Sequence, residues 1–173
     1  MPEISVSKRS ENLIESIIEK FGENFERWEF VKMFKENGDE CAQAVKINGN
    51  WFSYPDFKKK NKTDKVLVFV EVKGYDGYFA DIEYGLGIKI NQFKSYSKIQ
   101  FEESSQVRIC FVIWIDEKPF IFWETLNNMK KMEKQILKDY QFTKKSKPMD
   151  YYIFDCREFR TDYKNIPRFA WDE

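Results

Sequence analysis

Residues 54–74 read YPDFKKKNKTDKVLVFVEVKG, and this stretch predicts the centre of the fold. Its second half, residues 66–72, consists almost entirely of β-branched and aliphatic residues, and polar turn residues precede it. Such a run is typical of a buried central strand. Because successive side chains of a strand point to opposite faces, the valines at 66, 68, 70 and 72 would share one face. Glu71 and Lys73 would lie together on the other face.

Pro55 and Asp56 stand fifteen positions before Glu71 (71 − 56 = 15). Proline suits the irregular edge of a strand. We expect a hairpin that runs from residue 51 through Asp56, turns in a lysine-rich loop and returns along residues 66–72. This hairpin would bring Asp56 beside Glu71 and Lys73. Buried charges are costly unless they are paired or bound to a metal, so two carboxylates and an ammonium at one point indicate a site.

The pattern Pro55-Asp56, hairpin, Glu71-Val72-Lys73 resembles the PD-(D/E)XK nuclease superfamily. Downstream, residues 92–96 read QFKSY and resemble the Gln-x-x-x-Tyr motif of the RecB-like branch, near the Holliday-junction resolvases. The resemblance covers about residues 10–126. It implies an α/β fold: a single domain with a central mixed β-sheet flanked by helices, the restriction-endonuclease-like core.

The resemblance also implies a metal site. Asp56 and Glu71 would be its carboxylate ligands, and the backbone carbonyl of Val72 would be a further ligand. Hard oxygen ligands suit Mg²⁺ or Mn²⁺, and Mg²⁺ is usually held by one or two carboxylates together with water and phosphate oxygens. Lys73 would orient or deprotonate the attacking water. The implied activity is hydrolysis of DNA phosphodiester bonds by a metal-activated water.

Two helices would complete the site. Gln92 and Tyr96 are four residues apart, so they share one helix face. The resemblance implies that Gln92 positions the water or the substrate, and that Tyr96 contacts a phosphate or supports the site. In junction-resolving members a glutamate near the start of the first helix joins the metal site. Glu11 fits that position best, and Glu15 is the other candidate. The alternative for Glu11 is a solvated acid favoured by the helix N-terminus.

A run of lysines crowds the predicted hairpin loop, namely Lys58, Lys59, Lys60 and Lys62. Next to a phosphodiester site these lysines could bind the phosphate backbone of DNA. A charge run of this kind is also common in a loop that simply faces solvent, and both interpretations stay open. A homodimer is compatible with cutting two strands, but the sequence does not indicate one.

Composition narrows the function further. The chain has 173 residues, 42% hydrophobic and 34% charged, which fits one soluble domain spanning residues 1–173. It contains no histidine, which excludes catalysis by Ser-His or Cys-His pairs and histidine-bound zinc. No signal-peptide or membrane-length apolar run is present, and the three cysteines form no CxxC, so we expect a cytoplasmic protein with reduced thiols.

The remaining elements follow from periodicity and turn signals. Residues 23–50 are the least legible part and contain a candidate insertion. The predicted elements are a helix over 11–21 capped by Ser10, a strand over 41–47 paired with 51–54, a helix over 88–101, strands over 107–115 and 120–123, a last helix over about 126–140 capped by Thr125, and a strand over 151–154.

Two alternatives to a nuclease stay open. One is a non-catalytic nucleic-acid-binding or assembly protein that retains the nuclease fold. The other is a structural protein in which Asp56 and Glu71 never meet. The sequence does not distinguish endonuclease from exonuclease action, DNA from RNA, or one DNA structure from another.

Overall fold

The strand predicted at residues 66–72 lies in the middle of a six-stranded mixed sheet in the computed structural model of the chain. The structure describes residues 5–20, 25–27, 44–47, 50–53, 55–60, 66–76, 85–102, 104–141, 144 and 147–161. In spatial order the sheet strands are β1 (Phe25–Arg27), β4 (Phe57–Lys60), β5 (Val66–Asp76), β7 (Gln106–Ile115), β8 (Lys118–Thr125) and β11 (Arg160–Thr161).

Strand β5 has a different kind of neighbour on each side. It pairs antiparallel with β4, with Phe57 opposite Val70, and parallel with β7, with Glu71 opposite Ile109. A parallel pair requires a crossover connection. Here the crossover contains β6 (Leu86–Lys89) and α2 (Ile90–Glu102), the helix that bears the Gln-x-x-x-Tyr motif. The central position predicted for this strand is therefore confirmed.

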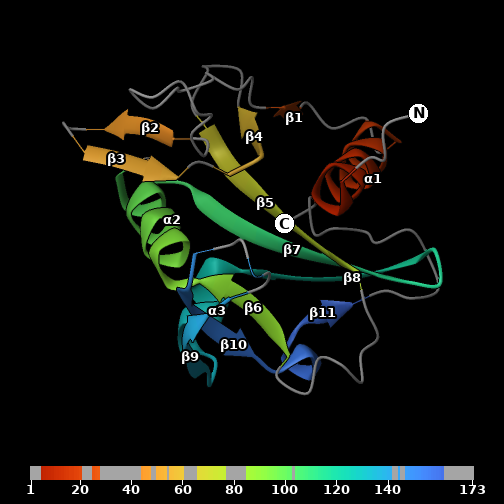
Figure 1. Ribbon diagram of the computed structural model, residues 1–173. Helices are drawn as coiled ribbons and strands as arrows, with labels where there is room; N and C mark the ends of the chain where they lie inside the picture. The colour runs from red at the N-terminus through yellow and green to blue at the C-terminus, as the bar shows by residue number, and fades with distance from the viewer. Residues whose placement is uncertain are drawn as a thin grey trace.

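Helices cover both faces of the central sheet (Figure 1). Helix α1 (Val6–Lys20) packs on the face that holds Val70 and Val72. The opposite face holds Phe69 and packs against α2, α3 (Leu126–Lys131) and a second sheet. The alternation expected along β5 is confirmed, because its two sets of side chains lie in two different hydrophobic clusters. The result is one compact α/β domain.

The second sheet has three strands in the order β6-β10-β9, with β9 at Gln135–Tyr140 and β10 at Met149–Phe154. A separate two-stranded sheet joins β2 (Ala44–Ile47) to β3 (Asn50–Ser53), as predicted for these segments. A short 3-10 turn at Cys156–Glu158 precedes β11. None of the helices in the described ranges is long and apolar enough to cross a membrane.

Helix α1 approaches β5 very closely at Gly74. Ser10 of α1 is fully buried, donates its hydroxyl to the Val6 carbonyl (2.8 Å) and accepts a hydrogen bond from Trp114 Nε1 (2.9 Å). A Cβ atom at Gly74 would lie 2.3 Å from Ser10 Oγ. The absence of a side chain at Gly74 therefore allows this approach. A second tie holds the helix, because Arg9 stacks over the Trp114 ring and pairs with Glu117 in the β7–β8 turn.

Three predictions about these elements are wrong. Ser10 does not cap the first helix, which begins one turn earlier with the Ser5 hydroxyl accepting the N–H of Lys8. The stretch predicted at 51–54 does not join the central sheet, since its described part lies in β3 and β4 takes the place beside β5. The last helix begins after Thr125 as predicted but ends at Lys131, and residues 135–140 pair with β10 instead.

The lysine run also differs from its prediction. Lys58, Lys59 and Lys60 lie in strand β4 rather than in a hairpin loop. Lys62 lies outside the described residues. The helix predicted from residue 88 begins at Ile90, because residues 86–89 form β6. In the poorly legible segment 23–50, β1 belongs to the central sheet and β2 does not.

Candidate active site

The candidate site lies beside the first residue of β4, where β5 extends further and has no β4 residue next to it. Strand β4 begins at Phe57, opposite Val70, so no β4 residue is left to pair with Val72. The side chain of Asp56 occupies this position, and its Oδ2 accepts the Val72 backbone N–H at 2.7 Å. The N–H and C=O of one strand residue point to the same side. The Val72 carbonyl therefore points to the same edge as the Asp56 carboxylate.

Glu71 and Lys73 stand on the face of β5 that packs against α2. Glu71 is only 4% exposed, an unusual burial for a carboxylate. Lys73 is partly buried, and its ammonium donates to Glu71 Oε1. The buried acid is thus charge-paired within its own strand, as the sequence pattern predicts.

Tyr96 brings helix α2 into the same site. Its side chain is 1% exposed in the core, and the phenol lies close enough to the Glu71 carboxylate for the two groups to interact. Burial raises the pKa of Tyr96 well above its usual value, and the charges of Glu71 and Asp56 raise it further. The phenol therefore stays protonated at neutral pH and remains a donor to Glu71.

The electrostatics of Asp56 indicate that negative charge is concentrated here. Burial raises the pKa of Asp56 well above its usual value, and the nearby charge of Glu71 raises it further. The Val72 N–H and the Lys73 ammonium act in the opposite direction but do not cancel these effects. An additional positive charge at this position would stabilise the ionised form of Asp56.

Helix α1 adds a third acid, Glu11, to the negative charge near Asp56. The Glu11 carboxylate lies close enough to Asp56 that its charge also raises the pKa of Asp56. Glu11 is partly buried and lies 3.8 Å from the Lys8 ammonium. The docking of Ser10 beneath Trp114 fixes the position of the adjacent Glu11 relative to β5.

The remaining predicted site residues are Gln92 and the lysine run. Gln92 lies one turn before Tyr96 on α2, but within the described chain its side chain makes no hydrogen bond to the site, and its backbone N–H is bound by Asn91 Oδ1 at 2.8 Å. Lys58 is partly buried in β4. The role predicted for Lys58, Lys59, Lys60 and Lys62 in DNA binding stays a prediction.

The donor set at this edge fits a hard divalent cation. Asp56 and Glu71 supply carboxylate oxygens, and the Val72 carbonyl points to the same edge. Within the described ranges no three His, Cys, Asp or Glu side chains are close enough together to hold an ion. Mg²⁺ does not require three such side chains, because it usually keeps several waters and takes one or two carboxylates.

Tyr75 adds a further side chain to this face of β5. The strand continues through Asp76, and Tyr75 points to the same face as Glu71 and Lys73. Its hydroxyl donates to the Gly87 carbonyl at 2.7 Å, which links β5 to the segment that leads into α2. The signal that could have revealed it is the two-residue period after Glu71 and Lys73, although Gly74 reads as a turn in the sequence.

Comparisons with protein-family models, with curated proteins and with solved structures found no match to this chain. The functional argument therefore depends on the geometry of the site.

Proposed function

We propose that this protein is a metal-dependent nuclease that hydrolyses DNA phosphodiester bonds at the site formed by Asp56, Glu71 and Lys73. The observation that carries the proposal is that Asp56 lies beside the part of β5 that bears Glu71 and Lys73. Asp56 is bound to the Val72 N–H between the other two residues, and Lys73 pairs with Glu71. The order of elements, from α1 through the β4–β5 hairpin and α2 to the parallel β7, supports the resemblance to the PD-(D/E)XK superfamily.

In this proposal Asp56, Glu71 and the Val72 carbonyl hold Mg²⁺ or Mn²⁺. When bound, the ion supplies positive charge to the scissile phosphate and makes a nearby water more acidic. Lys73 orients that water, or accepts its proton after its own ammonium has given up a proton to solvent. The water oxygen bonds to phosphorus as the bond to the leaving 3′ oxygen breaks, and a proton reaches that oxygen, giving a 5′-phosphate and a 3′-hydroxyl.

Tyr96 and Gln92 have supporting roles in the proposal. The buried Tyr96 phenol interacts with the Glu71 carboxylate and would help to orient it. Gln92 projects from the same face of α2 one turn earlier and is free to bind the substrate phosphate or the water. A defined orientation of the carboxylate matters because a small misplacement of a catalytic group is costly.

The test is a Mg²⁺-dependent cleavage assay on plasmid, linear duplex, single-stranded and junction DNA, with RNA as a further substrate. Glu71→Gln is the test variant and Glu124→Gln is its matched control. Glu124 is equally buried, at 4% exposed, but lies two strands away and binds the Thr125 N–H, Asn128 and Arg160. We expect Glu71→Gln to abolish cleavage and Glu124→Gln to retain it. Equal cleavage by both variants would overturn the proposal.

The assay also separates the main alternative. A non-catalytic protein that retains the nuclease fold would bind DNA and cleave none of the substrates with either Mg²⁺ or Mn²⁺. Cleavage of RNA alone would support the chemistry proposed for this site and would show that the substrate is RNA rather than DNA.

A further inference from the structure

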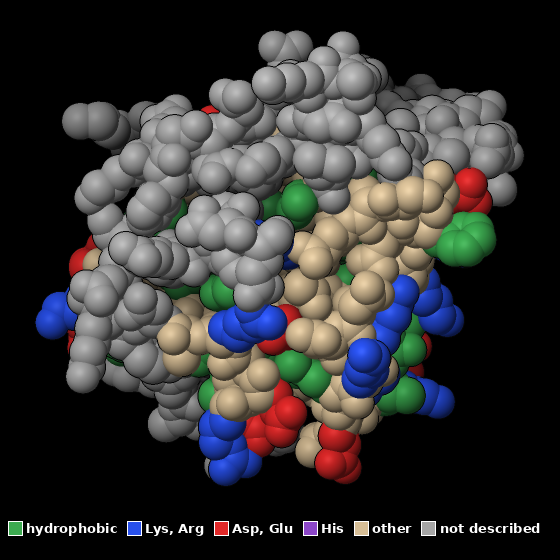
Figure 2. Space-filling view, turned by 180° about the vertical axis from the view of Figure 1, so that it is seen from behind, with side chains coloured by type: hydrophobic (Ala, Val, Ile, Leu, Met, Phe, Trp, Pro, Cys, Tyr) green, Lys and Arg blue, Asp and Glu red, His purple; other side chains and the backbone are tan. Residues whose placement is uncertain are grey.

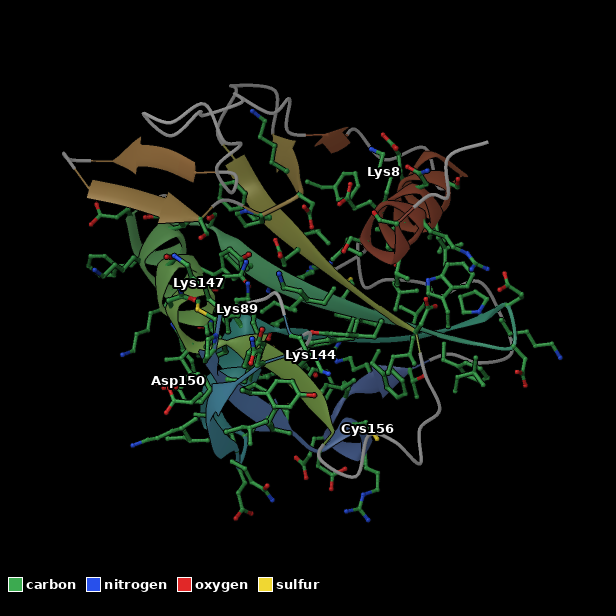
Figure 3. The ribbon with its side chains drawn as sticks, in the orientation of Figure 1. Lys8, Lys89, Lys144, Lys147, Asp150 and Cys156 are labelled. Atoms are coloured by element: carbon green, nitrogen blue, oxygen red, sulfur yellow. The ribbon has the colours of Figure 1, made fainter. Side chains whose placement is uncertain are left out.

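Three lysines lie on or beside the second sheet. Lys89 is the last residue of β6, and Lys144 and Lys147 belong to the connection between β9 and β10, where residues 144–147 read KKSK. Figure 3 shows Lys89 and Lys147 near the start of α2, with Lys144 further along β6. We call Lys89, Lys144 and Lys147 the β6–β10 lysine cluster.

The strand register explains why residues so far apart in sequence come together. Strands β6 and β10 are antiparallel, and Lys89 lies opposite Tyr151. The chain just before Tyr151 therefore extends past the end of β6, toward the residues that follow Lys89. This places Lys147 beyond the end of β6, on the side where α2 begins. Lys144 is tied to the same connection, because its carbonyl accepts a hydrogen bond from Gln141 at 3.1 Å.

The charges of the cluster are not neutralised within the protein. Lys144 and Lys147 are exposed and Lys89 is partly buried. None of the three ammonium groups makes an ion pair or hydrogen bond in the part of the chain that the structure describes. The neighbouring acid, Asp150, accepts the Asp139 backbone N–H through its Oδ1 at 3.0 Å. The cluster therefore presents positive charge that an external anion could neutralise.

A short path connects the cluster to the candidate active site. Gly87 is two residues before Lys89, a distance of about 7 Å along a strand, and its carbonyl accepts the Tyr75 hydroxyl. Tyr75 stands on the same face of β5 as Glu71 and Lys73, and the Glu71 charge helps to raise its pKa. The step from Glu71 to Tyr75 is about 13 Å along the strand. A polymer with repeated negative charges could contact both places at once.

We propose that the β6–β10 lysine cluster binds the phosphodiester backbone of the DNA whose cleavage is proposed at Glu71, and in naming DNA this inference rests on that proposed function. The protein as a whole has no net charge, with 29 basic and 29 acidic residues. The back of the molecule shows side chains of both signs interspersed over its described part (Figure 2). Attraction of a polyanion therefore requires a local cluster, and phosphate contacts of this kind fix position rather than sequence.

The experiment measures DNA binding apart from cleavage. The full chain is titrated into a fluorescein-labelled duplex in EDTA, and anisotropy is recorded over a series of salt concentrations. The test variant is Lys89→Gln/Lys144→Gln/Lys147→Gln. The matched control, Lys118→Gln/Lys130→Gln/Lys131→Gln, removes the same charge from exposed lysines elsewhere. We expect the test variant to lose about one unit of salt slope for each lysine that contacts a phosphate, and to bind about tenfold more weakly or worse.

Each outcome decides the inference. An unchanged salt slope in the test variant, or an equal loss in the control, would overturn it. If the triple variant does not fold, Lys144→Gln/Lys147→Gln changes only exposed lysines and should lose about two units of slope. Lys144→Arg/Lys147→Arg should restore the slope, because it restores the charge. If cleavage depends on Glu71 but the cluster variants bind DNA normally, the inference is wrong and the proposed function stands. If DNA binding depends on the cluster but no DNA is cleaved, the cluster binds DNA and the proposed function is wrong.

Discussion

The backbone N–H of Val72 donates a 2.7 Å hydrogen bond to Oδ2 of Asp56, so a carboxylate takes the place that a neighbouring strand would otherwise occupy. This contact joins two segments that the sequence separates by a hairpin. It also places the Asp56 carboxylate near buried Glu71. Burial and the charge of Glu71 both raise the pKa of Asp56. The site thus combines a structural hydrogen bond with a repulsion between two carboxylates.

The first prediction concerns stability in the absence of metal. The pKa of Asp56 is raised in the folded protein, so the protonated carboxyl is the form that favours folding. Its contribution to stability is fully present below the pKa of the unfolded chain and is lost as pH rises through the pKa of the folded protein. Asp56→Asn retains an acceptor for Val72 and removes the charge. In EDTA at neutral pH the variant should melt higher, by about 2–4 °C for each kcal/mol gained.

Measuring the wild type and Asp56→Asn at several pH values provides the control. The stabilising effect of Asp56→Asn should shrink toward pH 4, where the wild-type carboxyl becomes protonated, and Mg²⁺ should raise the melting temperature of the wild type more than that of the variant. Calorimetry at several pH values checks both points. A variant that melts lower than the wild type at neutral pH in EDTA would contradict the prediction.

The second prediction separates metal binding from turnover. Lys73→Met should retain Mg²⁺ affinity, since an ammonium is not a ligand, but lose about 10²–10⁴-fold in kcat if the lysine transfers a proton. Glu71→Gln should weaken Mg²⁺ binding itself. Isothermal titration with Mg²⁺ and single-turnover cleavage distinguish the two variants. Full activity of Lys73→Met would remove the lysine from the mechanism and leave the metal site intact.

The third prediction concerns Tyr96. Tyr96→Phe keeps the buried ring but removes the hydroxyl that donates to Glu71. Leaving the buried carboxylate without this donor should cost about 1–3 kcal/mol of stability. Denaturant unfolding measures the loss, and kcat should fall with little change in KM because Glu71 is less well oriented. Ser97→Ala, one residue further on α2, removes a hydroxyl that donates to the Phe93 carbonyl and serves as control.

The fourth prediction tests the docking of α1. A methyl group at Gly74 would lie 2.3 Å from Ser10 Oγ and 2.8 Å from the Val6 carbonyl oxygen, so Gly74→Ala should destabilise by about 1–3 kcal/mol or more. Gly87→Ala is the matched control, because its methyl would meet the flexible end of the Ile153 side chain at 3.1 Å. Equal melting temperatures for the two variants would show that α1 shifts without cost.

The sequence was most informative where local pattern and burial agree. The apolar run ending at Glu71 predicted the central strand and its two faces, and the spacing from Asp56 predicted that Asp56 would lie beside this strand. The four-residue spacing in α2 predicted that Tyr96 would face the site. The first and third of these depend on periodicity within one element, whereas the second depends on a hairpin between two segments.

The sequence was less informative where the choice depended on tertiary pairing. Trp51 and Phe52 are aromatic and β-prone, whereas β4 reads Phe-Lys-Lys-Lys, yet β4 is the strand that pairs with β5. Strand propensity mainly reflects packing context, so it could not decide between them. Ser5 and Ser10 are both good caps by type, and burial of Ser10 under Trp114 settled the helix start. Nothing local in the sequence records that contact.

The parallel pairing of β5 with β7 has a consequence for the order of folding. Glu71 and its partner Ile109 are 38 positions apart (109 − 71 = 38), whereas β7 and β8 are joined by the two residues Asp116 and Glu117. Closing a long loop costs entropy before its contacts form, so we expect the β7–β8 hairpin to form early and the β5–β7 pair later. Glu71 and Lys73 would then reach their final positions near the end of folding, and a ligand of this site would slow unfolding without speeding folding.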